Sequence, residues 1–348
     1  MTEEITDLRS LYKNELYDLM EELSEKKYRA DQLFLWMHSK LKDCFGYMGN
    51  IPGALKSELE KRDMVIRRTQ TELVRVSKLD GTRKYLFKLF DGNLIESVFM
   101  RYEHGNTVCV SSQAGCRMGC RFCASTIDGL CRNLTAGEML GQVYAISADV
   151  GESISNVVIM GSGEPLDNYE NVIRFIRLLN DEDGLNISQR NITLSTCGIV
   201  PMIHKLKEED LQITLAISLH APNDEKRKTL MPVANKYPVY ELIKACKDYY
   251  SQNRRRITFE YSLIKGVNDS SSDAQELSAL LSGMNAHVNL IPVNPVKERG
   301  YESTGRDEVL AFQNKLEKNN INVTIRRELG RDIEGACGQL RRGYLRGE

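Results

Sequence analysis

Strand and helix patterns alternate along this sequence from residue 107 to residue 319. Short apolar runs rich in β-branched residues predict six strands, at 107–113, 156–161, 191–196, 213–219, 257–263 and 288–293. Stretches with helical periodicity follow them, at 136–149, 169–180, 200–208, 239–252, 274–281 and 307–319. This alternation predicts a parallel sheet with right-handed crossovers. Six units are too few for a closed eightfold barrel, so we predict an α/β fold built as a partial six-stranded (β/α)6 barrel.

Two other segments precede the predicted barrel. Residues 1–75 have helical apolar spacing and predict a small N-terminal helical accessory domain. Asp80-Gly81 and Asp91-Gly92 are hairpin turn signals, and they predict a β-meander extension at 76–101. The barrel core is then expected at 102–332, and a C-terminal loop with a basic tail at 333–348.

The composition excludes several classes of protein. With 41% hydrophobic residues and a net charge of -1, the chain is neither disordered nor a uniformly basic nucleic-acid binder. The acidic start is not a signal peptide, and no apolar run has the length of a membrane span. We therefore expect a cytoplasmic protein without a membrane partner.

The nine cysteines are odd in number and irregularly spaced, which argues against a disulfide framework. Cys116, Cys120 and Cys123 have the spacing C-x3-C-x2-C in the loop after the first predicted strand. Three thiolates on one loop can hold three irons of a [4Fe–4S] cluster and leave the fourth iron open. The alternative is a structural zinc site, which normally has a fourth ligand that is missing beside this trio.

Polar residues and glycines lie at the carboxyl ends of the other predicted strands, where such sheets bind ligands. Each alone is more often a turn or cap residue, but together they predict one ligand-binding rim. The candidates for contact with a cofactor are Gly163, Glu164, Ser195, Ser218, Leu219, His220 and Asn294.

The three-cysteine loop, with Phe122 beside its last cysteine, resembles the radical S-adenosylmethionine superfamily. The resemblance implies one [4Fe–4S] cluster held by Cys116, Cys120 and Cys123, with S-adenosylmethionine bound at the open iron. It also identifies the predicted barrel as the partial barrel of that superfamily.

A closer resemblance, from about residue 26 to the end, is to the dual-specificity RNA methyltransferases. The segments that carry it are 28–34, 108–113, 132–138, 216–224, 265–269, 289–295 and 332–340. It implies methylation of C2 of an adenine in 23S rRNA and in tRNA. A sister group that methylates C8 of the same rRNA adenine is the alternative within enzymes, and Pro165 favours the C2 group. A zinc-stabilised RNA-binding module without catalysis is the alternative outside them.

The resemblance also implies roles for three catalytic residues outside the cysteine trio. Cys337 takes a methyl group from one S-adenosylmethionine, and a 5′-deoxyadenosyl radical made from a second one takes a hydrogen from that methyl. The carbon radical adds to C2 of adenine, and Cys109 then releases the product by forming a transient disulfide with Cys337. Glu96 matches the position of the proton acceptor, although its sequence pattern alone favours a residue on a solvent face.

Expected partners are 23S rRNA, tRNA and a reducing system such as flavodoxin or ferredoxin, and we expect a monomer. Six arginines in residues 322–348 and the run Arg254-Arg255-Arg256 are local basic patches that suffice for phosphate contacts. Each patch is equally consistent with a solvated surface.

Overall fold

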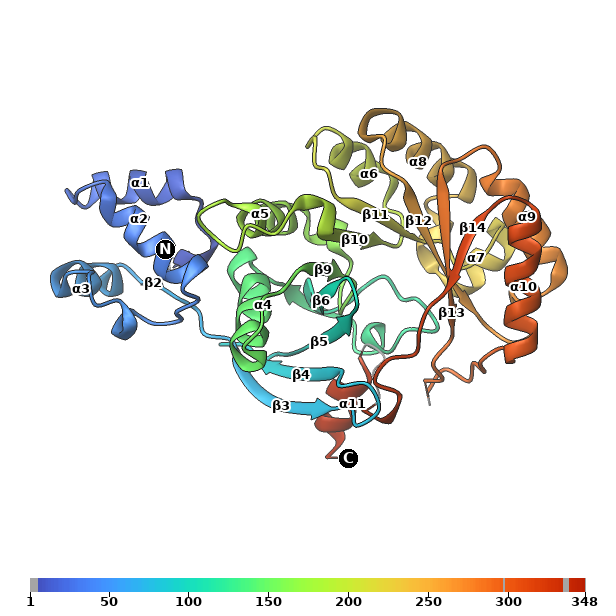
Figure 1. Ribbon diagram of the computed structural model, residues 1–348, viewed down its shortest axis with the longest axis horizontal. Helices are drawn as coiled ribbons and strands as arrows, with labels where there is room; N and C mark the ends of the chain where they lie inside the picture. Colours follow the sequence, from blue (N-terminus) through green and yellow to red (C-terminus); the bar gives the residue numbers. More distant parts are fainter. Residues whose placement is uncertain (1–5, 297, 334–337, 348) are drawn as a thin grey trace.

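The structure, a computed structural model, describes residues 6–296, 298–333 and 338–347. A ten-stranded sheet runs through the molecule in the order β14-β13-β12-β11-β10-β9-β6-β5-β4-β3 (Figure 1). Its parallel part contains β6 (Gly105–Cys109), β9 (Asn156–Ile159), β10 (Ile192–Thr196), β11 (Thr214–Ser218), β12 (Ile257–Leu263), β13 (Ala286–Pro292) and β14 (Asn322–Ile325). Each of the six predicted barrel strands is therefore present.

The seventh parallel strand, β14, is absent from the sequence-based prediction. It has four residues, pairs with β13 and alternates between exposed and half-buried positions. A strand at the edge of a sheet buries little apolar surface, so its sequence lacks a continuous apolar run. β14 matters for the site because Arg326, the residue that follows it, bonds through its backbone N–H to the Leu290 carbonyl oxygen at 2.8 Å.

Helices cover the outer face of the parallel strands (Figure 1). They are α4 (Ala136–Val150), α5 (Tyr169–Asn180), α6 (Val200–Lys207), α7 (Asp224–Leu230), α8 (Val239–Asn253), α9 (Ser271–Leu281) and α10 (Arg306–Lys318). Thr135 is the N-cap of α4, and its side chain forms a capping box with Glu138. Apolar side chains between the helices and the strands make one continuous core.

The β-meander adds three antiparallel strands to the same sheet: β3 (Gln70–Val76), β4 (Arg83–Lys88) and β5 (Leu94–Tyr102). The expectation of helix throughout 1–75 is wrong for β3, which pairs with β4, and for two short strands, β1 (Thr6–Asp7) and β2 (Met64–Val65). The division of the chain into domains remains a prediction.

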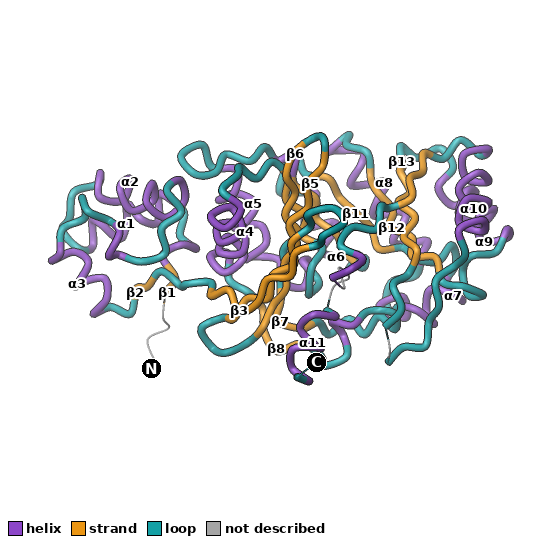
Figure 2. Tube along the Cα trace, turned by 60° about the horizontal axis from the view of Figure 1, so that its bottom comes forward, coloured by secondary structure: helices purple, strands orange, loops and turns teal. Residues whose placement is uncertain are grey.

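The N-terminal helices are α1 (Lys13–Glu22), α2 (Tyr28–Phe34) and α3 (Gly53–Lys61), and they lie at the opposite end of the molecule from α9 and α10 (Figures 1 and 2). His38 joins this unit to the barrel, because its Nδ1 lies 2.8 Å from the Tyr144 hydroxyl on α4. At the other end of the chain, α11 (Gln339–Arg346) packs against β5. No helix among the described residues is long and apolar enough to cross a membrane.

Candidate active site

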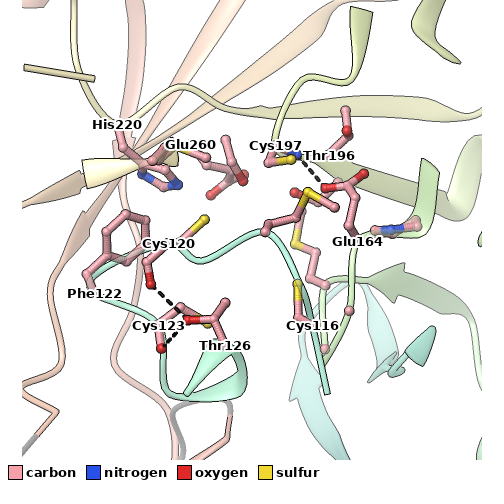
Figure 3. A pocket seen from close by; sticks show the side chains of 18 of the residues that line it. Cys116, Cys120, Phe122, Cys123, Thr126, Glu164, Thr196, Cys197, His220 and Glu260 are labelled. Atoms are coloured by element: carbon pink, nitrogen blue, oxygen red, sulfur yellow. Dashed lines mark hydrogen bonds between the residues drawn. The ribbon is translucent and has the colours of Figure 1, made fainter. Parts of the chain in front are cut away.

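The cysteine trio lies on a loop, residues 116–129, that two short strands hold at its base. These strands, β7 (Gln113–Gly115) and β8 (Leu130–Asn133), pair with each other, and Cys116 N–H donates to the Gly129 carbonyl at 2.8 Å. Inside the loop, the Thr126 hydroxyl donates to the carbonyls of Cys120 and Cys123, each at 3.0 Å (Figure 3). These bonds fix the backbone that carries the three thiols; we call residues 116–129 the cluster loop.

The three thiols line one cavity of about 180 Å³, which we call the first cavity (Figure 3). Burial raises the pKa of the Cys116 thiol to about 12, and burial together with the neighbouring thiols raises the pKa of Cys120. Within the described residues, no three His, Cys, Asp or Glu side chains are close enough to hold one metal ion. In a cubic cluster each thiolate binds a different iron, whereas the ligands of a zinc site all bind one ion. Three thiols that are too far apart to hold one ion therefore fit a [4Fe–4S] cluster better than a zinc ion.

Five predicted cofactor-contact residues line the first cavity together with the cysteines: Gly163, Glu164, Ser195, Ser218 and His220. Gly163 has φ +111, and a Cβ there would lie 2.6 Å from the Ser112 hydroxyl, so glycine is required by the neighbouring strand end. The Leu219 side chain is instead buried in the hydrophobic core. Asn294 lines a different cavity, described below.

Glu164 presents a buried carboxylate to the first cavity. Its Oε1 accepts a hydrogen bond from Leu166 N–H at 3.0 Å. Its Oε2 accepts one from Cys197 N–H at 2.7 Å, as Figure 3 shows. Burial raises the pKa of this carboxyl, while the backbone donors oppose that shift. The two donors fix the orientation of the carboxylate, which can then accept from an ammonium group.

His220 is a neutral imidazole on the same cavity. Burial lowers its pKa to about 3, and its Nδ1 accepts from Ser262 N–H at 2.9 Å, which leaves the proton on Nε2. Its backbone has φ 56, and the Asn268 side chain donates to its carbonyl at 2.7 Å. Its ring meets that of Phe122 edge-on, with the centroids 4.8 Å apart.

A second cavity of about 450 Å³ adjoins the first one. Cys109 at the end of β6 and Asn294 after β13 both line it. Four residues line both cavities: Phe122, Cys123, Ile291 and Arg326. The last cysteine of the trio therefore lies at the boundary between the two spaces.

Glu96 is buried on β5, contrary to the solvent-face position that its sequence pattern favoured. Its Oε2 lies 3.3 Å from Lys84 Nζ and accepts from Gly338 N–H at 2.7 Å. Its Oε1 accepts from Arg341 N–H at 2.6 Å. The carboxylate thus binds the N-terminus of α11, the helix that follows Cys337 in sequence. Cys337 itself lies outside the described residues.

Side chains also fasten α11 to the cluster loop and to the loop after β13. Arg342 lies 3.2 Å from Asp128 in the cluster loop and 3.2 Å from Glu298, and Arg346 also contacts Glu298. The Gln339 side chain donates to the Pro295 carbonyl at 3.0 Å. At Gly338, an added Cβ would lie 2.7 Å from Ser125 N, so α11 begins in direct contact with the residues after Cys123.

Comparison with known proteins decides the family. Residues 110–277 match the family model described as Radical SAM superfamily, and residues 6–65 match that of the Ribosomal RNA large subunit methyltransferase N-terminal domain. The chain is 61% identical over 343 residues to "Probable dual-specificity RNA methyltransferase RlmN" of Lachnospira eligens, covering 98% of this chain and 97% of the relative. The same-named protein of Clostridium novyi is 56% identical, covering 96% and 97%. The chain belongs to the dual-specificity RNA methyltransferase family.

A solved structure agrees with this assignment. The crystal structure of a radical SAM methyltransferase from Sphaerobacter thermophilus superimposes with a TM-score of 0.91 at 43% identity. The match covers 96% of this chain and 98% of that one. The predicted fold class, the superfamily and its cofactors, a [4Fe–4S] cluster and S-adenosylmethionine, are thereby confirmed.

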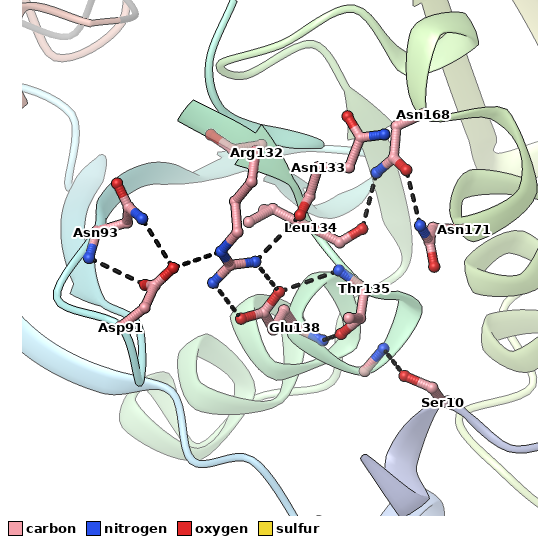
Figure 4. Close-up of polar contacts among 12 residues, drawn as sticks. Ser10, Asp91, Asn93, Arg132, Asn133, Leu134, Thr135, Glu138, Asn168 and Asn171 are labelled. Carbon is pink, nitrogen blue, oxygen red and sulfur yellow. Dashed lines mark hydrogen bonds and ion pairs between the residues drawn. The ribbon is translucent and has the colours of Figure 1, made fainter. Parts of the chain in front are cut away.

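In this dual-specificity RNA methyltransferase, Arg132 connects three parts of the chain (Figure 4). It forms two bonds of 2.8 Å to Glu138 at the start of α4 and also pairs with Asp91 in the meander. Ser10 in the N-terminal unit accepts from Gly137 N–H at 2.9 Å (Figure 4). The segment 132–138, which carried part of the family resemblance, therefore anchors the end of the cluster loop.

Sequence reasoning missed Glu260, Cys197 and Arg326, which also line the first cavity. Glu260 lies in the middle of β12, accepts from the Asn289 side chain at 2.9 Å, and has a pKa raised by burial. Its position two residues before Ser262 gave no turn or strand-end signal. The one available signal was a charged residue inside an otherwise apolar strand, since a buried charge needs a partner or a ligand.

Proposed function

We propose that this protein methylates C2 of adenine in 23S rRNA and in tRNA, using two molecules of S-adenosylmethionine per turnover. Membership of the dual-specificity RNA methyltransferase family supports the reaction. The observation that carries the assignment of residues is the shared boundary between the cavity of the cysteine trio and the cavity of Cys109, at Phe122 and Cys123.

The first cavity is proposed to hold S-adenosylmethionine beside the cluster on Cys116, Cys120 and Cys123. When bound, the cluster supplies the electron for reductive cleavage of S-adenosylmethionine to a 5′-deoxyadenosyl radical. Glu164 accepts hydrogen bonds from the ammonium group, because its carboxylate is already oriented by two backbone donors. Gly163, Ser195, Ser218 and His220 form the remaining contacts, and neutral His220 offers an Nε2–H donor. Leu219, between Ser218 and His220 in sequence, is proposed as a further contact.

The second cavity is proposed to receive the target adenine. Cys337 carries the methyl group. The Cys109 thiolate attacks the Cys337 sulfur, so that an S–S bond forms as the bond from this sulfur to the methylene carbon breaks, and the carbon takes up a proton to complete the methyl group of the released RNA. Two observations support this pairing: Cys109 is paired with Val98 on β5, and Glu96, two residues before Val98, bonds the N–H of Gly338. Because side chains alternate along a strand, Glu96 and Val98 share one face of β5. Asn294 is proposed to contact the bound nucleosides from the other wall.

Glu96 is proposed as the acceptor of the C2 proton. Its carboxylate is held by Lys84 and by two amides of α11, so the same group also anchors the start of that helix.

RNA is proposed to enter over Arg326, Arg327 and Arg331, which line the second cavity. Arg341 and Arg342 of the same basic tail face Asp128 instead, so they hold α11 rather than RNA. A small one-electron carrier such as flavodoxin or ferredoxin is the proposed reductant. We also propose that the enzyme acts as a monomer in the cytoplasm.

The deciding experiment is an anaerobic assay with reconstituted protein, methyl-labelled S-adenosylmethionine, and unmodified 23S rRNA fragments and tRNA. Mass mapping should find one added methyl at adenine C2 in both RNAs, and the protein should contain about four irons and four sulfides. A methyl on C8 would replace this function with that of the sister group. Colourless protein with one stoichiometric zinc and no methyl transfer would overturn the radical mechanism.

A further inference from the structure

A cluster of arginines lies away from both cavities. A hollow of about 400 Å³ is lined by Arg190, Thr214, Arg254, Arg255, Arg256 and Thr258. Every lining side chain is a hydrogen-bond donor, and four of the six are cationic. The hollow has no part in the chemistry proposed above.

The strand register places this hollow at the amino-terminal mouth of the barrel. Thr214 is four residues before Ser218 on β11, and Thr258 is two residues before Glu260 on β12. Ser218 and Glu260 line the first cavity, and residues separated by two or four positions face the same side of a strand. At about 3.3 Å per residue, Thr214 lies about 13 Å from Ser218 along the strand. The first cavity therefore lies at one end of the barrel interior, and the arginine hollow lies at the other end.

The four arginines lack counterions within the part of the chain that the structure describes. Arg190, Arg254, Arg255 and Arg256 form no ion pair there, whereas other arginines such as Arg132 and Arg342 each contact two carboxylates. Like charges gathered without a carboxylate are unfavourable unless an anion joins them.

The hollow is also organised before any ligand arrives. The Arg255 guanidinium donates to the Thr214 hydroxyl at 3.1 Å and to the Arg190 carbonyl at 3.4 Å. Its Nε is buried with no hydrogen-bond partner, and burial together with the charge of Arg190 lowers its pKa. The planar guanidinium is therefore fixed with unused donor capacity, which reduces the entropy lost on binding.

We propose that the amino-terminal mouth of the barrel is a phosphate-binding site whose ligand is a backbone phosphate of RNA. Guanidinium groups pair with phosphate oxygens through parallel hydrogen bonds, and the two threonine hydroxyls add neutral donors. Arg254 and Arg256 are exposed, so they can reach neighbouring phosphates of a strand as well as the one in the hollow. The RNA source rests on the proposed function, whereas phosphate binding does not.

The test uses the reconstituted full-length protein and fluorescein-labelled oligouridylate, which contains no adenine and so cannot be methylated. Its affinity is measured by anisotropy over a range of KCl concentrations for wild type, for Arg254→Gln/Arg256→Gln and for Lys205→Gln/Lys265→Gln. The control pair removes the same charge from exposed lysines that contact Glu170 and Glu302. A second arm measures binding of inorganic phosphate by calorimetry.

Removal of two phosphate contacts should make the slope of log affinity against log salt shallower by about 1.4, since each contact on a single strand contributes about 0.7. The control pair should match wild type. If the arginine variant loses binding of inorganic phosphate but keeps the wild-type salt slope for oligouridylate, the hollow is a site for a free anion, and the assignment of its ligand to RNA is overturned. Unchanged oligouridylate and phosphate binding would overturn the proposal. Methylation of tRNA is assayed separately, so its failure is distinguishable from failure of the phosphate site.

Discussion

The N–H of Gly338 donates a hydrogen bond to Glu96 Oε2 at 2.7 Å, across 242 positions of sequence. Gly338 follows Cys337, the proposed methyl carrier, in sequence, and Glu96 is the proposed proton acceptor. Arg341 N–H completes the contact at 2.6 Å, so one carboxylate caps the start of α11. The proposed proton acceptor is therefore fixed to the start of α11, the helix that follows Cys337 in sequence.

Replacement of Glu96 should separate its two roles. Glu96→Gln keeps an oxygen that can accept from an α11 amide but removes the base, so product formation should fall by at least about 100-fold. Covalent RNA–protein adduct should accumulate and be visible as a shifted band of labelled RNA on a denaturing gel. The matched control is Glu72→Gln, because Glu72 accepts from Tyr344 on the exposed side of α11. Normal turnover by Glu96→Gln would remove Glu96 from proton transfer.

Cys109→Ala should trap RNA on the enzyme. The variant retains Cys337 for methyl transfer, but no second thiol remains to attack its sulfur. Covalent adduct should appear in roughly stoichiometric amount, while free methylated RNA falls at least about 100-fold. Cys246→Ala is the control, since that cysteine is fully buried in the core on the inner face of α8. Release of free product at the wild-type rate from Cys109→Ala would contradict the resolving role.

Arg342→Ala should weaken the attachment of α11 to the cluster loop. The Arg342 side chain is 14% exposed and bridges Asp128 and Glu298. We expect turnover to fall about tenfold with unchanged iron content, because displacement of a catalytic group by even 1 Å costs about 100-fold. Arg346→Ala removes a more exposed contact to the same Glu298 and should change turnover less than about twofold. Equal effects of the two variants would show that the bridge to Asp128 has no positioning role.

His38 should make folding stability depend on pH. Burial lowers its pKa to about 3, so below about 6.5 the unfolded chain binds a proton that the folded chain does not. The resulting loss of stability grows as pH falls from about 6.5 towards 3, and it reaches about 2 kcal/mol at pH 5. His38→Leu should therefore reduce the difference in unfolding free energy between pH 7 and pH 5 by about 2 kcal/mol. Exposed His204→Leu is the control; an unchanged pH difference in His38→Leu would show that His38 is protonated in the fold.

The alternation of apolar strands and amphipathic helices was sufficient to predict the parallel sheet and its six principal helices. It missed α7, where Asp224, Glu225, Lys226, Arg227 and Lys228 leave no apolar stripe, although Arg227 is buried and bonds the carbonyls of Leu219 and Cys197. Arginine in a buried hydrogen-bonded position is indistinguishable from surface arginine in a sequence pattern. It missed β14 for the opposite reason, because an edge strand buries too little to show an apolar run.

The residues of the candidate site also differ in how far the sequence alone could predict their positions. Cys116, Cys120 and Cys123 are close in sequence, so their spacing predicted their common cavity. The burial of Glu96 required knowledge of α11, which lies at the other end of the chain. Ser218 and Glu260 become neighbours because β11 and β12 pair in a register that places these two residues side by side. No local sequence pattern specifies that register.

The boundary of Phe122, Cys123, Ile291 and Arg326 has a consequence for inhibition. A small molecule with two linked purine groups would place one group in each space, because the same four residues line both cavities. Such a compound gains from effective concentration, since binding of one group delivers the other to its space. It would also discriminate against enzymes that have a cofactor cavity alone, for which the second group would have no site.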